Sequence, residues 1–103
     1  MKFDFSGLVK FEWDRGNINK NWMKHSVSDK ECEQIFFNDP LIIFPDEKHS
    51  KKEERFGAFG ITNLERKLTV FYTKRGDMVR VISARDQSKR ERDFFKKEVL
   101  KNL

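Results

Sequence analysis

Hydrophobic and polar side chains alternate with two different periods along the chain, and the change of period separates the predicted strands from the predicted helices. From Leu8 to Trp13 the period is two, which predicts a strand with one buried face. Ile18 and Trp22 are four residues apart, which predicts a short helix that ends near His25 and for which Asp14 is the expected N-cap. The chain is therefore expected to begin with a strand and a helix.

A second helix is predicted to begin at Ser28. Ser28 and Glu31 form an S-x-x-E pattern, in which the hydroxyl and the carboxylate accept hydrogen bonds from backbone N–H groups at a helix start. Three apolar residues are expected on its buried face: Cys32, Ile35 and Phe36. The helix should end before Pro40, because the residue that precedes a proline is disfavoured in a helical conformation.

The rest of the chain predicts four short strands joined by turns. They are expected at Leu41–Phe44, Glu54–Ile61, Lys67–Thr73 and Met78–Ser83. Pro45 stops the first of them, which favours a place at the edge of the sheet. The short connections between the last three, such as Arg75-Gly76-Asp77, favour an antiparallel meander.

A C-terminal helix is predicted after a break at Ala84–Gln87. Ser88 and Glu91 repeat the S-x-x-E pattern, and Phe95 and Val99 form an apolar pair on the helix. The predicted fold class is therefore α+β, with the order strand–helix–helix, antiparallel meander and C-terminal helix on one curled antiparallel sheet. A chain of 103 residues is expected to fold as one domain, residues 1–103.

Most of the aromatic residues are assigned to the core. Five are expected there outright: Phe11, Trp13, Phe36, Phe56 and Phe71. Trp22 and Tyr72 are also expected mainly to pack in the core, although either ring can instead stack on a nucleic-acid base.

The net charge is concentrated at one end of the chain. Residues 1–73 contain 12 basic and 12 acidic residues, whereas residues 74–103 contain 10 basic and 5 acidic residues, so the whole net charge of +5 lies in the last part. This concentration favours a polyanionic partner, either a nucleic acid or an acidic protein. A basic helix that is merely solvated is the simpler alternative.

Several other classes of protein are not expected. No apolar run is long enough to cross a membrane, and the first residues, MKFDFSG, lack the apolar core of a secretory signal. The single Cys32 cannot form an internal disulfide and fits a reducing cytoplasm. One cysteine and two distant histidines do not make a zinc pattern, and no nucleotide-binding motif is present, so neither a metal ion nor a cofactor is predicted.

The basic residues of the C-terminal part gather where the last strand meets the last helix. Arg80 lies in the strand, Arg85 stands at its exit, and three further cations follow on the helix: Lys89, Arg90 and Arg92. A guanidinium is always charged and binds a phosphate through two parallel hydrogen bonds. This corner is therefore predicted to bind anions, with Arg80 and Arg85 as the preferred phosphate clamps.

Four blocks of sequence follow one another along the chain. They are Phe11-Glu12-Trp13-Asp14 with Asn21, Lys24-His25 and Val27-Ser28; Phe37-Asn38-Asp39-Pro40; Glu53-Glu54-Arg55-Phe56 with Gly60; and Arg80-Val81-Ile82-Ser83-Ala84-Arg85 with Arg90-Glu91-Arg92. In this order the blocks resemble the BrnT-type toxins of bacterial type II toxin–antitoxin pairs. Two positions depart from the family pattern, since Asn17 stands where lysine is usual and Ser26 where glycine is usual. Serine tolerates a positive φ poorly, so Ser26 is expected to stiffen or distort its turn.

The resemblance implies a fold similar to that of the RelE-like ribonucleases, and an activity that cleaves RNA and thereby inhibits translation. It also implies a cognate antitoxin with a ribbon-helix-helix DNA-binding domain, which neutralises the toxin. Operator DNA would be bound only through that antitoxin. The expected assembly is a homodimer or a toxin–antitoxin heterotetramer.

Metal-independent RNA cleavage by the 2′-hydroxyl needs a base, an acid, and cations that stabilise the charge on the phosphate. His25 is the candidate acid–base, because histidine exchanges protons near neutral pH. Glu54 is the candidate base, with Glu53 as its rival. Arg80 and Arg85 complete the predicted catalytic set. The predicted RNA-binding residues are Lys24, Arg55, Lys89, Arg90 and Arg92.

Each candidate also has a purely structural explanation. His25 can cap or pack at a helix end, Glu54 can be a surface charge beside an arginine, and Arg80 can be buried against a carboxylate or extend past apolar neighbours. His49 lies in a polar loop and is expected to contact RNA at most. Two alternatives to an enzyme therefore stay open: a non-catalytic nucleic-acid-binding module that uses the basic C-terminal edge, and an interaction domain that recruits an acidic protein.

Overall fold

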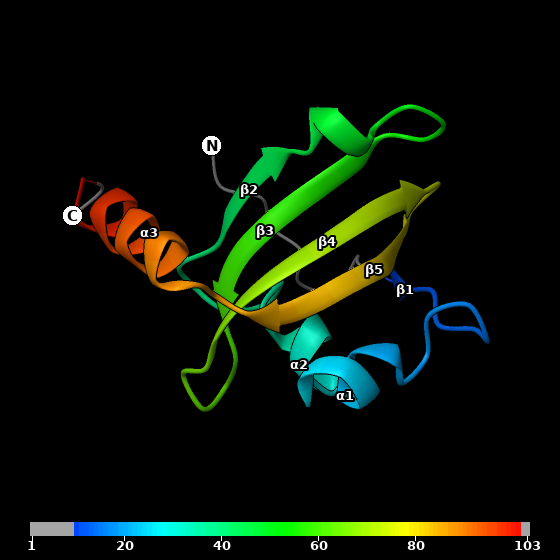
Figure 1. The fold of residues 1–103 in the computed structure, drawn as a ribbon, viewed down its shortest axis with the longest axis horizontal. Helices are drawn as coiled ribbons and strands as arrows, with labels where there is room; N and C mark the ends of the chain where they lie inside the picture. Colours follow the sequence, from blue (N-terminus) through cyan, green and yellow to red (C-terminus); the bar gives the residue numbers. More distant parts are fainter. Residues whose placement is uncertain (1–9, 102–103) are drawn as a thin grey trace.

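The computed structural model describes residues 10–101, which form a five-stranded sheet and three α-helices (Figure 1). The strands lie in the order β1-β5-β4-β3-β2, with the bounds β1 (Lys10–Phe11), β2 (Ile42–Pro45), β3 (Arg55–Ile61), β4 (Lys67–Arg75) and β5 (Met78–Asp86). The helices are α1 (Lys20–His25), α2 (Asp29–Gln34) and α3 (Lys89–Lys101), and a short 3₁₀ helix, η1 (Glu47–His49), follows β2. The predicted α+β class is confirmed.

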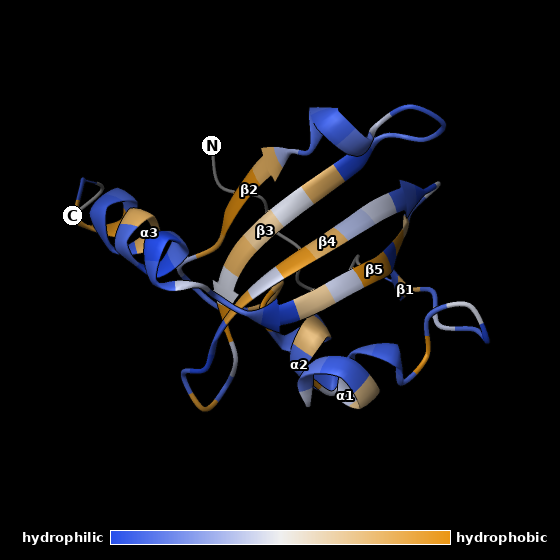
Figure 2. Ribbon diagram, viewed as in Figure 1, coloured by the Kyte–Doolittle hydropathy of each residue, from blue (hydrophilic) through white to orange (hydrophobic). Residues whose placement is uncertain are grey.

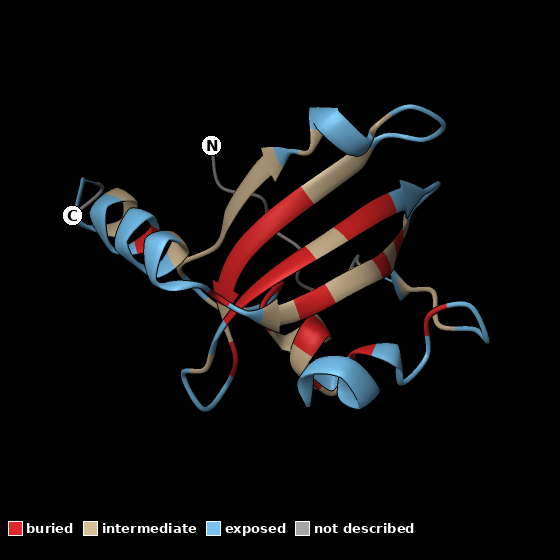
Figure 3. Cartoon of the chain, viewed as in Figure 1, coloured by how far each residue is buried: buried red, intermediate tan, exposed pale blue. Residues whose placement is uncertain are grey.

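One face of the sheet packs against α2 and forms the core. Alternate residues of β4 point to this face, so Leu68, Val70 and Tyr72 are at most 2% exposed, as their spacing predicts. The helix contributes the predicted set of Cys32, Ile35 and Phe36, all of them buried. Hydrophobic and buried residues coincide in the middle of β3, β4 and β5 (Figures 2 and 3).

The opposite face of the sheet packs against α3 at the end where β5 exits. There the Glu91 carboxylate accepts a hydrogen bond of 3.0 Å from the Thr69 hydroxyl. The Phe94 ring lies 5.9 Å from the ring of Phe59. From this contact α3 extends away from the strands (Figure 1). We call this side of the sheet the open face; the residues that define it are Phe44, Arg55, Phe59, Thr69, Phe71, Ser83 and Arg85.

The sheet is mixed rather than wholly antiparallel. The meander β2–β3–β4–β5 is antiparallel as predicted, but β1 pairs in parallel with β5, with Lys10 beside Met78 and Phe11 beside Val79. The chain passes through two helices and three strands between β1 and β5, so no hairpin fixes their direction. The predicted first strand is also shorter than Leu8–Trp13, because Trp13 lies outside it, while Leu8 and Val9 fall outside the described residues.

The break predicted at Ala84–Gln87 is wrong, because β5 continues to Asp86. An irregularity in the pairing explains the error. Tyr72 pairs with Val81 and Phe71 with Ser83, so Ile82 is an extra residue on β5. After this bulge the alternation is reset, and Ala84 rather than Ser83 faces the core, with 0% exposure. The alternation of buried and exposed residues is therefore interrupted near Ser83, although the strand itself continues to Asp86.

The apolar stripe predicted on α1 does not face the core. Ile18 is 47% exposed and Trp22 is 54% exposed, so the expectation that Trp22 packs in the core is wrong. The residue of α1 that is buried is Asn21, whose Oδ1 accepts a hydrogen bond of 2.9 Å from the Ala84 N–H. A buried polar side chain thus connects α1 to β5, and the spacing of apolar residues in the sequence gives no sign of this contact.

The five aromatic residues assigned to the core differ in burial. Phe36 is fully buried, and three others pack against the core while partly exposed: Phe11, Trp13 and Phe56. The Trp13 indole N–H donates to Glu33 Oε2 over 2.7 Å. Phe71 is the exception, because it points to the open face, where its ring lies 6.4 Å from that of Phe44.

Both S-x-x-E patterns form capping boxes. In each, the Glu backbone N–H donates to the serine hydroxyl and the Ser backbone N–H donates to the Glu carboxylate, at Ser28–Glu31 and at Ser88–Glu91. The first helix has a different start from the one predicted: its N-cap is Asn19, in the left-handed conformation, and not Asp14.

The two departures from the family pattern have definite structural roles. Ser26 adopts the left-handed conformation, with φ 54°, that a glycine occupies easily. Its N–H bonds to the Trp22 carbonyl over 3.0 Å. Asn17 is buried, and its Nδ2 donates to the carbonyl oxygens of Glu12 and Val81. Asn17 therefore connects the loop before α1 to β5.

Replacing Gly60 by alanine should lower the free energy of unfolding by about 1–3 kcal/mol, because the new Cβ would lie 2.8 Å from Ile35 Cβ and α2 would have to move. Urea denaturation measures this difference. Gly76→Asn is the matched control: Gly76 has a φ of +64°, which asparagine tolerates, and nothing lies within 4 Å of a Cβ there. Equal stability of the Gly60→Ala variant and the wild type would contradict this packing of α2 on β3.

Candidate functional site

A cavity of about 290 Å³ opens on the open face of the sheet. It is lined by Asp46, His49, Arg55, Phe71 and Ser83. Phe71 and Ser83 are paired across β4 and β5, and Gly57 is the residue of β3 opposite Phe71, so the floor of the cavity spans three strands. Arg55 begins β3, and the segment 46–50 forms the wall beside it.

His49 and Asp46 form a pair at this wall. His49 Nδ1 lies 3.1 Å from both carboxylate oxygens of Asp46. In the tautomer that donates Nδ1–H to Asp46, Nε2 of the ring is left to accept a proton from a bound molecule. The histidine side chain is 55% exposed and the aspartate side chain 14% exposed. Asp46 is therefore placed to orient a ring that is accessible to a substrate.

Ser50 ties this histidine to the start of β3. Its hydroxyl donates to the Asp46 carbonyl over 2.8 Å and accepts from the Arg55 N–H over 2.9 Å. The Asp46 N–H donates in turn to the Arg55 carbonyl over 2.8 Å. These three bonds close the loop on itself, so the Ser50 hydroxyl and one backbone hydrogen bond determine the position of His49 relative to Arg55.

Arg55 carries an unused hydrogen-bond donor. Its Nε is buried and has no hydrogen-bond partner among the described residues. A buried donor without a partner costs about 1–3 kcal/mol, and an anion in the cavity would provide the missing acceptor. Arg55 was predicted to bind RNA, and the structure places it beside an accessible histidine.

Arg80, the first predicted phosphate clamp, is already bound to carboxylates. It forms two bonds to Asp14, of 2.8 and 2.9 Å, and one of 2.9 Å to Glu12. Hydrogen bonding to Asp14 raises the pKa of Arg80, and the same contact lowers the pKa of Asp14. The Arg80 side chain is only 15% exposed. Arg80 therefore agrees with the structural alternative, in which it is buried against a carboxylate.

Arg85, the second predicted clamp, is bound in the same way. Its two terminal nitrogens donate to the two oxygens of Glu91 over 2.6 and 2.9 Å. The Arg85 hydrogen bond is the main reason why the pKa of Glu91 falls to about 2, although partial burial opposes it. Glu91 therefore caps α3 and holds Arg85 with one carboxylate.

The other two predicted catalytic residues lie at opposite ends of the sheet. Glu54 is exposed directly before β3, and its carbonyl accepts a bond of 2.7 Å from the Thr73 hydroxyl. His25 ends α1, and its carbonyl accepts from Arg66, which also binds Asp86 at the exit of β5. Along β5 the two ends are about 16 Å apart. The four predicted catalytic residues are thus not brought together, and their roles stay predictions.

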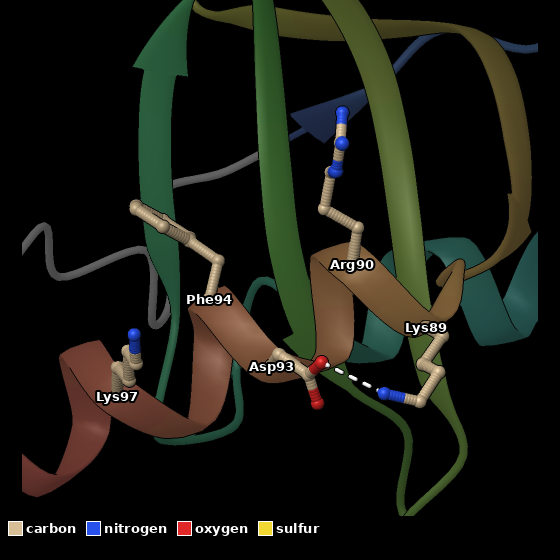
Figure 4. A pocket seen from close by; sticks show the side chains of 5 residues that line it. All are labelled: Lys89, Arg90, Asp93, Phe94 and Lys97. Carbon is tan, nitrogen blue, oxygen red and sulfur yellow. Dashed lines mark hydrogen bonds and ion pairs between the residues drawn. The ribbon is translucent and has the colours of Figure 1, made fainter.

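The remaining predicted RNA-binding residues are distributed over two helices. Lys24 is exposed on α1. On α3, Lys89 pairs with Asp93 over 3.2 Å, and Arg92 donates to the Gln87 carbonyl over 2.8 Å. Arg90 lies on another side of α3, beside Phe94 (Figure 4). Two of the three helical cations therefore have partners already.

His49 and Asp46 were not predicted as site residues. Their spacing of three residues is the only local signal in the sequence. Their contact with Arg55 arises because the segment 46–50 returns to β3, and the alternation of β4 and β5 then adds Phe71 and Ser83 to the same face. Within residues 10–101, no group of three His, Cys, Asp or Glu side chains is arranged to hold a metal ion, and no helix there is long and apolar enough to cross a membrane.

Comparison with known proteins identifies one family. The family described as "Ribonuclease toxin, BrnT, of type II toxin-antitoxin system" matches residues 13–91, which is most of the chain. The match includes every residue that lines the cavity. None of the curated proteins matches the sequence.

Replacing Arg85 by glutamine should destabilise the fold in a pH-dependent way. The pKa of Glu91 is about 2 in the folded chain against an ordinary value of 4.5, so the stabilisation is present above pH 4.5 and is lost as the carboxyl is protonated towards pH 2. Urea denaturation at pH 6 and pH 3 should therefore show a larger difference from the wild type at pH 6.

Lys89→Gln is the control for this experiment, because it removes the same charge from an exposed pair with Asp93. Such pairs contribute about 0–1 kcal/mol, so this variant should differ little from the wild type at either pH. A difference for Arg85→Gln that is the same at pH 6 and pH 3 would show that its bond to Glu91 does not stabilise the fold.

Proposed function

The chain belongs to the BrnT family of type II toxin–antitoxin ribonuclease toxins, and from this we propose that it cleaves RNA, without a metal ion, in the cavity between η1 and the open face. The observation that carries the proposal is the His49–Asp46 pair beside Arg55, whose Nε is buried and without a partner. The pair supplies proton transfer, and the guanidinium supplies charge for a phosphate. These are the requirements of cleavage by the 2′-hydroxyl.

In the proposed reaction the 2′-oxygen attacks the neighbouring phosphorus and the bond to the 5′-oxygen breaks. One group removes the 2′-proton and another protonates the leaving 5′-oxygen, which yields a 2′,3′-cyclic phosphate and a 5′-hydroxyl. His49 performs one of these transfers through Nε2, with Asp46 holding the ring. Glu54, the base predicted from the sequence, is proposed for the other; it directly precedes Arg55 in the chain and is not among the residues that line the cavity. Arg55 binds the phosphate oxygens, on which negative charge accumulates.

Phe71 and Ser83 form the floor of the cavity. An aromatic ring beside the phosphate site can stack on an unpaired base, and a hydroxyl can donate to a base or a phosphate. Arg80 and Arg85 take supporting roles in this proposal: Arg80 holds Glu12 and Asp14 beside the start of β5, and Arg85 fixes the start of α3 through Glu91. His25 is the competing proton-transfer group, because it was the predicted one.

We further propose that cleavage inhibits translation in the cytoplasm and that the fold is related to the RelE-like ribonucleases. The family is defined by a type II system, which supports a protein antitoxin as the partner. We propose that this antitoxin carries a ribbon-helix-helix domain, forms a heterotetramer with the toxin, and alone contacts the operator DNA.

The proposal predicts RNA cleavage by the purified chain in the presence of EDTA. His49→Ala should lower kcat by about 10²-fold or more, since proton transfer contributes a factor of this size. Arg55→Gln should lower it by about 10²-fold, and Arg55→Lys should restore less than the full activity, because lysine lacks the planar fork. The readout is the rate of appearance of 2′,3′-cyclic phosphate ends.

His25→Ala is the matched comparison, because it removes an exposed histidine at the other end of the sheet. It should cleave at the wild-type rate. Loss of cleavage in His25→Ala with full activity in His49→Ala would move the active site to the end of α1 and overturn the proposal. Equal cleavage by all variants would indicate a contaminating nuclease. If the wild type does not cleave free RNA, the assay is repeated with translating ribosomes.

The partner proposal predicts that the chain alone does not retard its operator DNA in a gel, whereas the complex with the cognate antitoxin does. The antitoxin should also abolish RNA cleavage at a molar ratio of one to one. Retardation by the chain alone would contradict the proposal that the antitoxin makes the DNA contacts.

A further inference from the structure

A second hollow lies along α3, outside the cavity described above. Its volume is about 510 Å³, and it is lined by Lys89, Arg90, Asp93, Phe94 and Lys97. Figure 4 shows that Arg90, Phe94 and Lys97 extend to one side of the helix, whereas the ion pair of Lys89 and Asp93 lies on the other side. The only carboxylate of the hollow is thus paired with a neighbouring lysine. Two cations and one ring remain on the side opposite this pair, where the Phe94 ring meets Phe59 of β3.

The spacing of these three residues places them on one face of the helix. Positions 90, 94 and 97 are four and three residues apart, which is one side-chain row of an α-helix. Along the axis Phe94 is about 6 Å from Arg90 and about 4.5 Å from Lys97. The row therefore places the Phe94 ring between two cationic side chains, both of which are long and flexible.

Phe94 is not used by the core. It is 47% exposed, whereas its neighbour Phe95 is 3% exposed and supplies the buried contact of α3. The Phe94 and Phe59 rings meet in an edge-to-face arrangement, with centroids 5.9 Å apart and planes inclined by 66°. This contact holds the ring in place and leaves part of it accessible. An accessible aromatic ring between two cations has the elements of a stacking site for an unpaired base.

We propose that Arg90, Phe94 and Lys97 form a subsite for single-stranded RNA that extends the cleavage cavity along the open face. One unpaired base stacks on Phe94, and the phosphates on either side of it bind Arg90 and Lys97. The subsite lies on the same face of the sheet as the cavity, because Phe59, which meets Phe94, and Arg55, which lines the cavity, are four residues apart on β3, about 13 Å. This inference rests on the proposed function, so RNA is the ligand expected both in the cavity and at the α3 subsite.

Single-stranded RNA explains the site better than a duplex does. In a duplex the bases are stacked on one another and are not available to Phe94, whereas a basic row alone would bind both forms. The excess of positive charge in residues 74–103, 10 basic against 5 acidic residues, supplies the attraction for the backbone. An acidic protein would use the same charge but would not require an unpaired base.

The test measures binding of the full chain to a fluorescent 12-nucleotide RNA that cannot be cleaved because its 2′-hydroxyls are methylated. Phe94→Leu keeps an apolar side chain against Phe59 and should weaken binding about fivefold or more. Arg90→Gln and Lys97→Gln should weaken it and each lower the slope of log affinity against log salt by about 0.7. A duplex of the same sequence should bind more weakly than the single strand and should be indifferent to Phe94→Leu.

Lys96→Gln is the matched control, since Lys96 is exposed on α3 but lies off the row of Arg90, Phe94 and Lys97. It removes the same charge and should change affinity less than twofold. The proposal is overturned if Lys96→Gln weakens binding as much as Arg90→Gln, if Phe94→Leu binds like the wild type, or if the duplex binds as tightly. Unchanged thermal unfolding midpoints establish that the variants are folded; the double variant Arg90→Gln, Lys97→Gln leaves the Phe94–Phe59 contact intact.

Cleavage assays separate this inference from the proposed function. The α3 variants should raise KM for long RNA and leave kcat unchanged, whereas His49→Ala should lower kcat. Cleavage that depends on His49 but is indifferent to α3 would overturn the subsite alone. Loss of RNA affinity in the α3 variants, together with a wild type that cleaves neither free RNA nor RNA on translating ribosomes, would overturn the proposed reaction alone.

Discussion

The packing of α2 against alternate residues of β4 is the constraint on which the rest of the structure depends. Leu68, Val70 and Tyr72 must face the helix to form the core, so their neighbours Thr69 and Phe71 must face the other way. A shift of one residue would exchange the two sets and bury the polar one. The core thereby determines which side chains of β3, β4 and β5 can take part in chemistry. The bulge on β5 preserves this division up to Asp86.

Five arginines of the described residues show two arrangements with different consequences. Arg66, Arg80 and Arg85 each bind carboxylates; Arg66 and Arg80 join segments that are distant in the sequence, and Arg85 joins the end of β5 to the first turn of α3. Removal of any of them leaves a carboxylate without its partner, which is costly where the pair is partly buried. Arg55 and Arg90 line hollows instead. In the two proposed sites the arginines available to a phosphate are therefore fewer than the sequence suggests, and they lie on β3 and α3.

Local patterns predicted the fold well because they are enforced locally. The serine–glutamate boxes at Ser28 and Ser88 and the alternation of β3 and β4 involve neighbours in the chain. The predictions were wrong where a contact between residues distant in the sequence determines the structure. Asn21 anchors α1 through Ala84, and the bulge lengthens β5. The site was harder for the same reason. The sequence indicated Arg55 as an RNA-binding residue but gave His49 at most a contact with RNA, because the proximity of His49 to Arg55 arises only when the loop returns to β3.

The way in which α1 is attached has a consequence for how such chains diverge. Its contacts with the rest of the molecule run through Asn21 and through backbone carbonyls that bind Arg66, while Ile18, Trp22 and Met23 point outwards. Substitutions at these outward positions leave the packing of the core unchanged, so selection for stable folding does not constrain them. The outer surface of α1 can therefore drift or adapt from one homologue to the next while the sheet and its cavity stay unchanged. The attachment of α1 to the sheet and its outward surface are thus carried by different residues of the same short helix.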